Sequence, residues 1–271
     1  MPQIDDQAWL AREQYKDSTN LNARIAIHDR FSTNPYPWMR WVFDQLDLPP
    51  EARVLEVGCG SGKLWAENAD RIPPGWRVTL TDLSPGMVAE ARGACAGAGR
   101  AAGGAAADAQ ALPFAAAAFD AVIANHMLYH VPDRPRALAE LRRVLRPGGR
   151  LVATTIGAGH MRELDTLLQR FDPMMPALWE PTAGGPSFEL ETGAAQLAPY
   201  FTAIEQRVQP NGLLVPDVEP IVAYIVSGRR AAWVGAHLDA LRRFVAAELA
   251  AHGPLQVTKE SGMFLARRAA G

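Results

Sequence analysis

The chain has 271 residues, of which 48% are hydrophobic and 21% are charged, and a formal net charge of −2. This composition predicts a globular protein with one large core, and the scattered Lys and Arg residues form no basic stripe of the kind that binds nucleic acid. Two cysteines exclude a disulfide framework, no apolar run of about 18 residues could span a bilayer, and the polar N-terminus is unlike a signal peptide, so we expect a cytoplasmic protein without a membrane partner.

Residues 1–48 precede the first predicted strand and are rich in aromatic side chains. Their pattern predicts helices over residues 4–16, 20–31 and 37–46, and Pro37 suits a first helical turn. The segment is too short to fold as a separate domain. We expect it to pack on the core, to close over a ligand as an N-terminal helical lid, or to do both.

Residues 49–156 alternate between predicted strands and helices. Strands are expected at 53–57, 76–81, 119–124 and 150–156, and a further strand within 103–107, where Ala and Gly leave almost no readable periodicity. Helices are expected at 85–94, after the N-cap Ser84, and at 135–145, before the Pro-Gly-Gly stop at 147–149. Repeated strand–helix units predict a parallel sheet with right-handed crossovers.

The rhythm breaks after residue 156. Residues 157–200 combine a predicted helix at 161–171 with several prolines, which indicates an insertion or lid over the active face. Residues 201–271 predict two late strands, at 201–215 and 256–267, with a helical insertion at about 217–252. We therefore expect the chain to finish the sheet with an antiparallel pair.

The most informative motif follows the first strand. Gly58, Gly60 and Gly62 separate the apolar run at 53–57 from a helix-like stretch, an arrangement that brings backbone N–H groups close to a ligand. A dinucleotide-binding loop has the spacing G-x-G-x-x-G, whereas this chain has Glu-x-Gly-x-Gly-x-Gly beginning at Glu56. The whole string resembles motif I of the class I S-adenosylmethionine (SAM) methyltransferases.

This resemblance is to the small-molecule branch, the type 11 methyltransferases similar to enzymes of ubiquinone and menaquinone biosynthesis. It implies an α/β fold with a doubly wound, seven-stranded Rossmann-like sheet and helical lid elements, with residues 49–156 as the SAM-binding core. It also implies SAM as cofactor and S-adenosyl-L-homocysteine as product. Glu56 would lie near the methionine end of SAM, above a loop formed by Gly58, Cys59, Gly60 and Gly62. The alternative for Glu56 is an ordinary surface position on a strand.

Three further acidic or amide positions match the family in order. Asp82 ends the second strand, twenty residues after Gly62, where a carboxylate accepts hydrogen bonds from ribose hydroxyls. The alternative is a helix cap, for which Ser84 is better placed. The resemblance implies that Leu83 and Met87 flank the adenine, that Asp108, Ala109 and Gln110 recognise it, and that Asn125 contacts the methionine portion. Asp108 could instead be a turn-forming residue at a strand end.

His126 and His130 are spaced four apart, which raises the question of a metal site. A zinc-protease helix requires Glu directly after the first His, and Met127 stands there, so we expect no metal. The segment instead resembles the family signature Leu-His-His-Val-x-Asp, with Tyr129 at the first of the two adjacent His positions. Either histidine could act as a general base, or the enzyme could need none.

The predicted activity is transfer of the SAM methyl group to O, N or C of a small, partly apolar metabolite by in-line displacement. In related enzymes a lid tyrosine closes over SAM, which makes Tyr15 a candidate. Two alternatives remain: a SAM-binding protein of this fold with a non-methylating activity, and an NAD-dependent oxidoreductase, against which the glycine spacing argues. A small-molecule acceptor, and a monomer or homodimer, are expected. Aromatic and Met side chains predict an apolar pocket or ordinary core, namely Phe31, Trp38, Met174, Met175 and Trp179.

Overall fold

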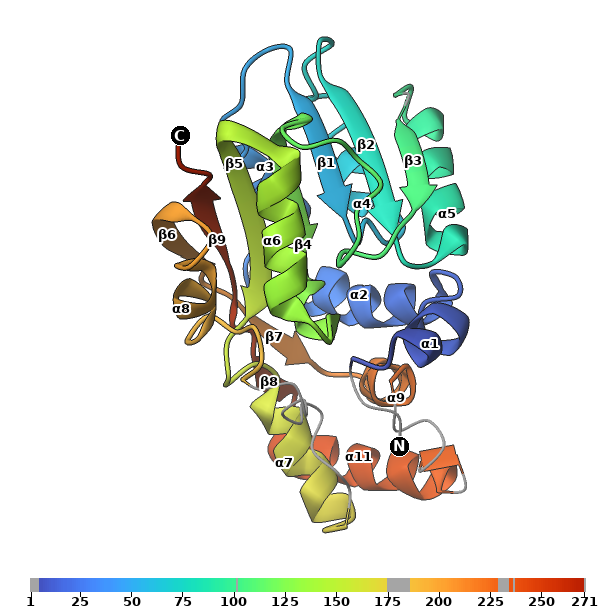
Figure 1. Cartoon of the computed structure of the whole chain (residues 1–271). Coiled ribbons are helices and arrows are strands. Elements are labelled where there is room, and N and C mark those ends of the chain that lie inside the picture. The colour runs from blue at the N-terminus through green and yellow to red at the C-terminus, as the bar shows by residue number, and fades with distance from the viewer. Residues whose placement is uncertain (1–4, 101, 175–185, 229–233, 236, 271) are drawn as a thin grey trace.

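The computed structural model describes residues 5–100, 102–174, 186–228, 234–235 and 237–270. Seven strands form one sheet in the order β3-β2-β1-β4-β5-β9-β6 (Figure 1). The first five run parallel, and β9 runs antiparallel to both β5 and β6. The predicted doubly wound methyltransferase sheet is therefore confirmed, with strands β1 Arg53–Val57, β2 Arg77–Asp82, β3 Gly103–Ala106, β4 Phe119–Asn125, β5 Leu145–Ile156, β6 Thr202–Gln209 and β9 Ser261–Arg267.

Helices cover both faces of this sheet. Helix α6 (Arg134–Val144) covers one face, whereas α3 (Trp38–Asp44), α4 (Lys63–Ala66) and α5 (Pro85–Gly97) pack on the other (Figure 1). Strand alternation divides the core accordingly, because Leu55 and Val57 join the α6 side and Val54 joins the α4 side. Glu56 shares the side of Val54, which is why its side chain meets α4.

Local signals place several elements as expected. Ser84 caps α5 by accepting a hydrogen bond from the Met87 N–H, with Pro85 in the first turn. The Pro-Gly-Gly turn before the fifth strand lies inside β5 as a bulge. Pairing with β4 jumps there from Leu145 to Arg150, and Gly148 adopts a φ of 74°.

The two late strands were each predicted as one element, and that prediction is wrong. Each run divides, giving the additional strands β7 (Gly212–Val215) and β8 (Leu255–Thr258), which pair with one another outside the main sheet. The register is continuous across the break, from Gln209 opposite Ser261 to Gly212 opposite Thr258. Pro210 has no N–H to donate, so the ladder is interrupted there and the ribbon leaves the sheet.

This ribbon and the N-terminal segment carry a helical layer across the carboxyl ends of the strands (Figure 1). The predicted helix at 4–16 is replaced by a short α1 and a π-helical turn, η1. Apolar side chains of α2, α7, α9, α11, β7 and β8 form a third buried cluster that holds the layer together. The helical layer consists of α1 Gln7–Trp9, η1 Leu10–Gln14, α2 Thr19–Phe31, α7 Arg162–Phe171, α9 Val218–Val226 and α11 Leu238–His252.

The segment predicted as an insertion at 157–200 has two destinations. Helix α7 joins the helical layer, whereas α8 (Gly193–Leu197) packs against Phe264 of the main sheet on the α6 side. Met175 and Trp179, which the sequence suggested for a pocket, lie outside the described residues. Among the residues that the structure describes, no helix has the length and apolar character to cross a membrane.

Candidate active site

A large cavity opens where the carboxyl ends of β1, β2 and β4 meet the helical layer, and its volume is about 780 Å³. Ligands of open α/β sheets bind at this edge, outside the carboxyl ends of the strands. One wall comes from the glycine loop after β1, and the opposite side comes from α2, α9 and the start of α3. We therefore expect the predicted site residues to line this cavity.

The glycine loop has conformations that only glycine adopts easily. Gly58, Gly60 and Gly62 have φ values of 71°, 52° and 77°. A Cβ added to Gly58 would lie 2.7 Å from the Met127 Cβ, and one added to Gly62 would lie 2.8 Å from the Ala91 Cα. Gly58, Cys59 and Gly60 line the cavity, whereas Gly62 faces α5 and supports the loop from behind.

Glu56 lies at the base of the cavity and is only 1% exposed. Trp65 Nε1 on α4 donates a hydrogen bond of 2.6 Å to its carboxylate. Burial raises the pKa of Glu56 to about 8, and the nearby Asp82 charge adds to this, although the Trp65 bond opposes it. The surface alternative for Glu56 is thus wrong, and a proton or a cationic ligand would neutralise this buried carboxylate.

Asp82 at the end of β2 holds the glycine loop in place. Its two carboxylate oxygens accept hydrogen bonds from the Gly60 N–H at 3.0 Å and the Ser84 N–H at 2.9 Å. Burial raises the pKa of Asp82 despite these bonds. Each oxygen retains a further lone pair, and the carboxylate lines the cavity. Leu83 and Met87 line the same region.

Asp108 lies after β3 and is contacted by the helical layer. Gln7 Nε2 on α1 donates to Asp108 at 3.1 Å, and the Gln110 N–H donates at 2.9 Å. Asp108 and Ala109 line the cavity, whereas Gln110 does not. The side chain of Gln110 is used locally, donating to Asp108 and accepting from the Asp133 N–H, so it orders the loop.

The chain turns sharply where β4 ends. Asn125 Oδ1 accepts a hydrogen bond of 2.6 Å from Thr154 Oγ1, and the same hydroxyl accepts from the His126 N–H at 2.8 Å. His126 adopts a φ of 52°, a left-handed conformation that is rare outside glycine and common at functional sites. Both side chains line the cavity. Burial lowers the pKa of His126 to about 3, with a contribution from the Lys259 charge.

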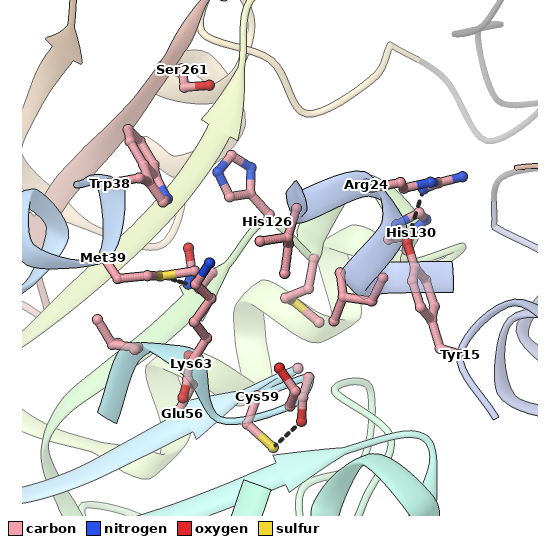
Figure 2. A pocket seen from close by; sticks show the side chains of 18 of the residues that line it. Tyr15, Arg24, Trp38, Met39, Glu56, Cys59, Lys63, His126, His130 and Ser261 are labelled. Carbon is pink, nitrogen blue, oxygen red and sulfur yellow. Dashed lines mark hydrogen bonds between the residues drawn. The ribbon is translucent and has the colours of Figure 1, made fainter. Parts of the chain in front are cut away.

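Tyr15 connects the N-terminal segment to the residues after β4. Its hydroxyl lies 3.2 Å from His130 Nε2 and accepts a hydrogen bond from Arg24 Nη1 at 3.3 Å (Figure 2). The three side chains form a satisfied chain when Tyr15 donates to His130. All three line the cavity, which places Tyr15 where a closing lid residue is expected.

Several lining residues gave no signal in the sequence. His28, His160, Tyr224 and Lys259 come from α2, the loop before α7, α9 and the break between β8 and β9. No motif joins them, because their proximity depends on how the helical layer folds over the sheet. Within the described ranges no group of three or more His, Cys, Asp or Glu side chains could hold a metal ion, and Cys59 and Cys95 are buried free thiols.

The parallel sheet with its antiparallel final pair and the glycine loop after β1 form the fold of the class I SAM-dependent methyltransferases. Residues 55–153, which span most of β1 to β5, match the family described as "Methyltransferase domain". Within this stretch the predicted methyltransferase domain, and with it SAM as the cofactor, is confirmed. The match also decides against an NAD-dependent oxidoreductase.

Named relatives agree on this class and differ in what they methylate. The chain is 36% identical over 126 residues to malonyl-[acyl-carrier protein] O-methyltransferase of Serratia marcescens, covering 45% of this chain and 46% of that protein. It is 28% identical over 201 residues to the ubiquinone/menaquinone biosynthesis C-methyltransferase UbiE of Ralstonia pickettii, covering 71% and 81%. The chain thus aligns with about half of the Serratia enzyme, and one relative is an O- and the other a C-methyltransferase.

Solved structures show the same fold over longer stretches. The [4+2]-cyclase SpnF aligns with a TM-score of 0.62 and 21% identity, covering 100% of this chain and 98% of its own. Phosphoethanolamine N-methyltransferase 2 of Haemonchus contortus, solved with SAM, aligns with a TM-score of 0.59 and 20% identity, covering 99% and 60%. At these identities the likeness establishes the fold, and the fold alone is compatible with more than one chemistry.

Proposed function

We propose that this protein transfers the methyl group of SAM to an O, N or C atom of a small, partly apolar metabolite. The observation that carries the proposal is a single cavity with two ends. The sheet end holds the residues expected to bind SAM, and the end beneath the helical layer is lined by aromatic and polar side chains, among them Trp38, His126, Tyr129 and Tyr224. A methyl donor and an acceptor would meet in one continuous cavity.

The chemistry of the sheet end fits SAM. The cofactor is a cation with a ribose and an adenine, and Glu56, Asp82 and Asp108 supply three carboxylates along that wall. Asp82 has spare lone pairs for ribose hydroxyls, Asp108 could accept from the adenine amino group, and Glu56 would face the charged methionine end. The glycine loop allows close approach, because a Cβ at Gly58 would already collide with Met127.

SAM supplies an electrophilic methyl group on a sulfonium, so the protein has chiefly to align the acceptor and exclude water. The N-terminal segment is fastened over the site for this purpose. Gln7 bonds Asp108, Tyr15 meets His130, and the Ser18 N–H donates to Glu90 on α5 at 3.3 Å. These contacts tie the lid to the sheet domain at three separate points.

A general base is not assigned. Catalytic bases work best when their pKa lies near the working pH. His126 has a pKa of about 3, so it is neutral at pH 7 but only weakly basic. His130 is engaged with Tyr15. Their geometry supports orientation of the acceptor by hydrogen bonds better than removal of its proton.

The decisive experiment has two stages. Calorimetry should detect SAM binding, and absence of binding at millimolar SAM would refute the proposal. Incubation with pools of small metabolites should then release S-adenosylhomocysteine, and mass spectrometry should find a product heavier by one methyl group. SAM binding and acceptor conversion without S-adenosylhomocysteine release would instead support a non-methylating activity on the same fold.

A further inference from the structure

Basic side chains converge at the end of the cavity beneath the helical layer. His28, His126, His160 and Lys259 come from four separate elements, and all four line the cavity. The His28 and His160 rings stack with centroids 5.9 Å apart, and the Trp38 and His126 rings lie 5.3 Å apart. Figure 2 shows Trp38, His126 and Ser261 grouped on the side of the cavity away from Cys59. We call these four basic residues the basic cluster.

Polar atoms of this region are buried without partners. His28 Nδ1, His160 Nδ1 and Trp38 Nε1 are enclosed and make no hydrogen bond. His160 is only 7% exposed. Native proteins pair nearly all such atoms, so an orphaned group needs an explanation, such as a catalytic role or a bound water or ion. The three orphaned nitrogens belong to residues that line one cavity, which makes this part of the cavity polar rather than apolar.

Lys259 is the only residue of the basic cluster that is charged at neutral pH, and it is 8% exposed. In the described parts of the chain no carboxylate lies within ion-pairing distance of it. Asp29, whose charge favours protonated Lys259, is bonded to Lys63, which also contacts Glu67 at 3.3 Å. Glu163, which faces His160, accepts bonds from Thr258. A buried cation without a counter-charge is costly.

We propose that the basic cluster binds an anionic group, a carboxylate or a phosphate, of the methyl acceptor. Such a group would pair with Lys259 beside the imidazole rings of the basic cluster. The two ends of the cavity then have opposite preferences, because Glu56, Asp82 and Asp108 at the sheet end suit the cationic cofactor. The acceptor would be a small acid whose anionic end is held away from the methyl donor.

The burial of the cluster supports this assignment. Burial lowers the pKa of His160 to about 3 and of Lys259 to about 8, and the Lys259 charge also lowers the pKa of His28 and His126. An anion at the centre of the cluster would oppose each of these shifts. That the anion belongs to the methyl acceptor rests on the proposed function. The binding of an anion to the basic cluster can be measured without any methyl transfer.

The test uses the full-length protein with ¹⁵N-labelled histidines, saturated with S-adenosylhomocysteine so that the cofactor carboxylate already has its place. Acetate, inorganic phosphate and neutral acetamide are titrated at constant ionic strength while imidazole resonances are followed. We expect saturable shifts at His28, His126 and His160 with an anion but not with acetamide. The exposed His252 on α11 serves as the internal control. Tighter binding of acetate indicates a carboxylate acceptor, and tighter binding of phosphate indicates a phosphate ester.

Substitution of Lys259 then tests whether its charge holds the anion. Lys259→Met should weaken anion binding about tenfold or more, because one charge-assisted contact is lost. Lys16→Met removes the same charge outside the cavity lining and should change it less than about twofold. Equal effects of the two variants, or equal shifts with acetamide, would overturn the proposal. So would a matching loss of S-adenosylhomocysteine affinity in Lys259→Met, because the cluster would then hold the cofactor. Methyl transfer by a protein that binds no anion would overturn the anion site and leave the proposed methyltransferase function standing.

Discussion

Substitution of one loop glycine separates two reasons for a glycine at this site. Gly62 and Gly99 both adopt left-handed backbone conformations, with φ values of 77° and 73°. A Cβ on Gly62 would lie 2.8 Å from the Ala91 Cα, whereas a Cβ on Gly99 would meet nothing within 4 Å. Gly62→Ala therefore adds a collision with α5 to the backbone strain, and Gly99→Ala adds strain alone.

The expected magnitudes follow from these contacts. An Ala in the left-handed region costs about 1–2 kcal/mol. Forcing extra volume into a packed site costs a further 1–3 kcal/mol or so. Gly62→Ala should therefore lower the free energy of unfolding by about 2–5 kcal/mol, and Gly99→Ala by about 1–2 kcal/mol. Since the Ala91 Cα belongs to the backbone of α5, it cannot move aside as the end of a flexible side chain would.

Urea unfolding followed by circular dichroism measures both variants. SAM calorimetry on the same samples tests the consequence for the site, because Gly62 lies directly behind the loop that Asp82 holds. We expect SAM affinity to fall in Gly62→Ala and to be unchanged in Gly99→Ala. Equal destabilisation of the two variants would refute the packing argument and leave backbone conformation as the sole reason for Gly62.

Three further outcomes test the carboxylates and the lid. Asp82→Asn should weaken SAM binding about 10–100-fold by calorimetry, since it removes the charge from the expected ribose contacts. The control is Asp133→Asn, a substitution at the exposed N-cap of α6, which should leave SAM binding unchanged. Similar losses in both variants would contradict the ribose assignment. Glu56 has a raised pKa, so its stabilising effect is complete below about pH 4.5 and is lost as pH rises through about 8. The free energy of unfolding should fall relative to Glu56→Gln by roughly 4 kcal/mol between pH 5 and 9, and a flat difference would show that Glu56 titrates normally. Tyr15→Phe removes the contacts to His130 and Arg24 and should weaken SAM binding about 2–10-fold, and unchanged affinity would separate Tyr15 from lid closure.

The sheet domain could be read from local sequence because its signals are local. An apolar run bounded by glycines marked β1, and Ser84 and Pro85 marked the start of α5. The Pro-Gly-Gly sequence marked the stop after α6, which the structure shows as a bulge inside β5. Repeated strand–helix units predicted a parallel sheet with right-handed crossovers, and the structure gives the order of its strands. The motif residues of the sheet domain lie at strand ends, which is why most of them converge on one edge.

The helical layer could not be read in the same way. Nothing in the run at 201–215 indicates that Pro210 ends the main sheet pairing while the register continues into β7. The split of the first predicted helix into α1 and a π-helical turn has no sequence marker either. The sequence motifs assigned Gly62 and Gln110 to the cofactor site, but neither lines the cavity. Gly62 faces α5, and the Gln110 side chain faces Asp133 in the loop before α6.

The sequence by itself predicted a parallel α/β sheet from its strand–helix repeats. Through the resemblance of the glycine loop and of the residues after β2, β3 and β4 to family motifs, it also predicted SAM as the cofactor, because each motif is short and local. Only the tertiary structure decided what lies across the cavity from the glycine loop. His28, His160 and Lys259 are separated by 132 residues and 99 residues along the chain, and no local periodicity links them. Their meeting depends on the β7–β8 ribbon and the N-terminal helices folding over the sheet, an arrangement set by burial of the third apolar cluster.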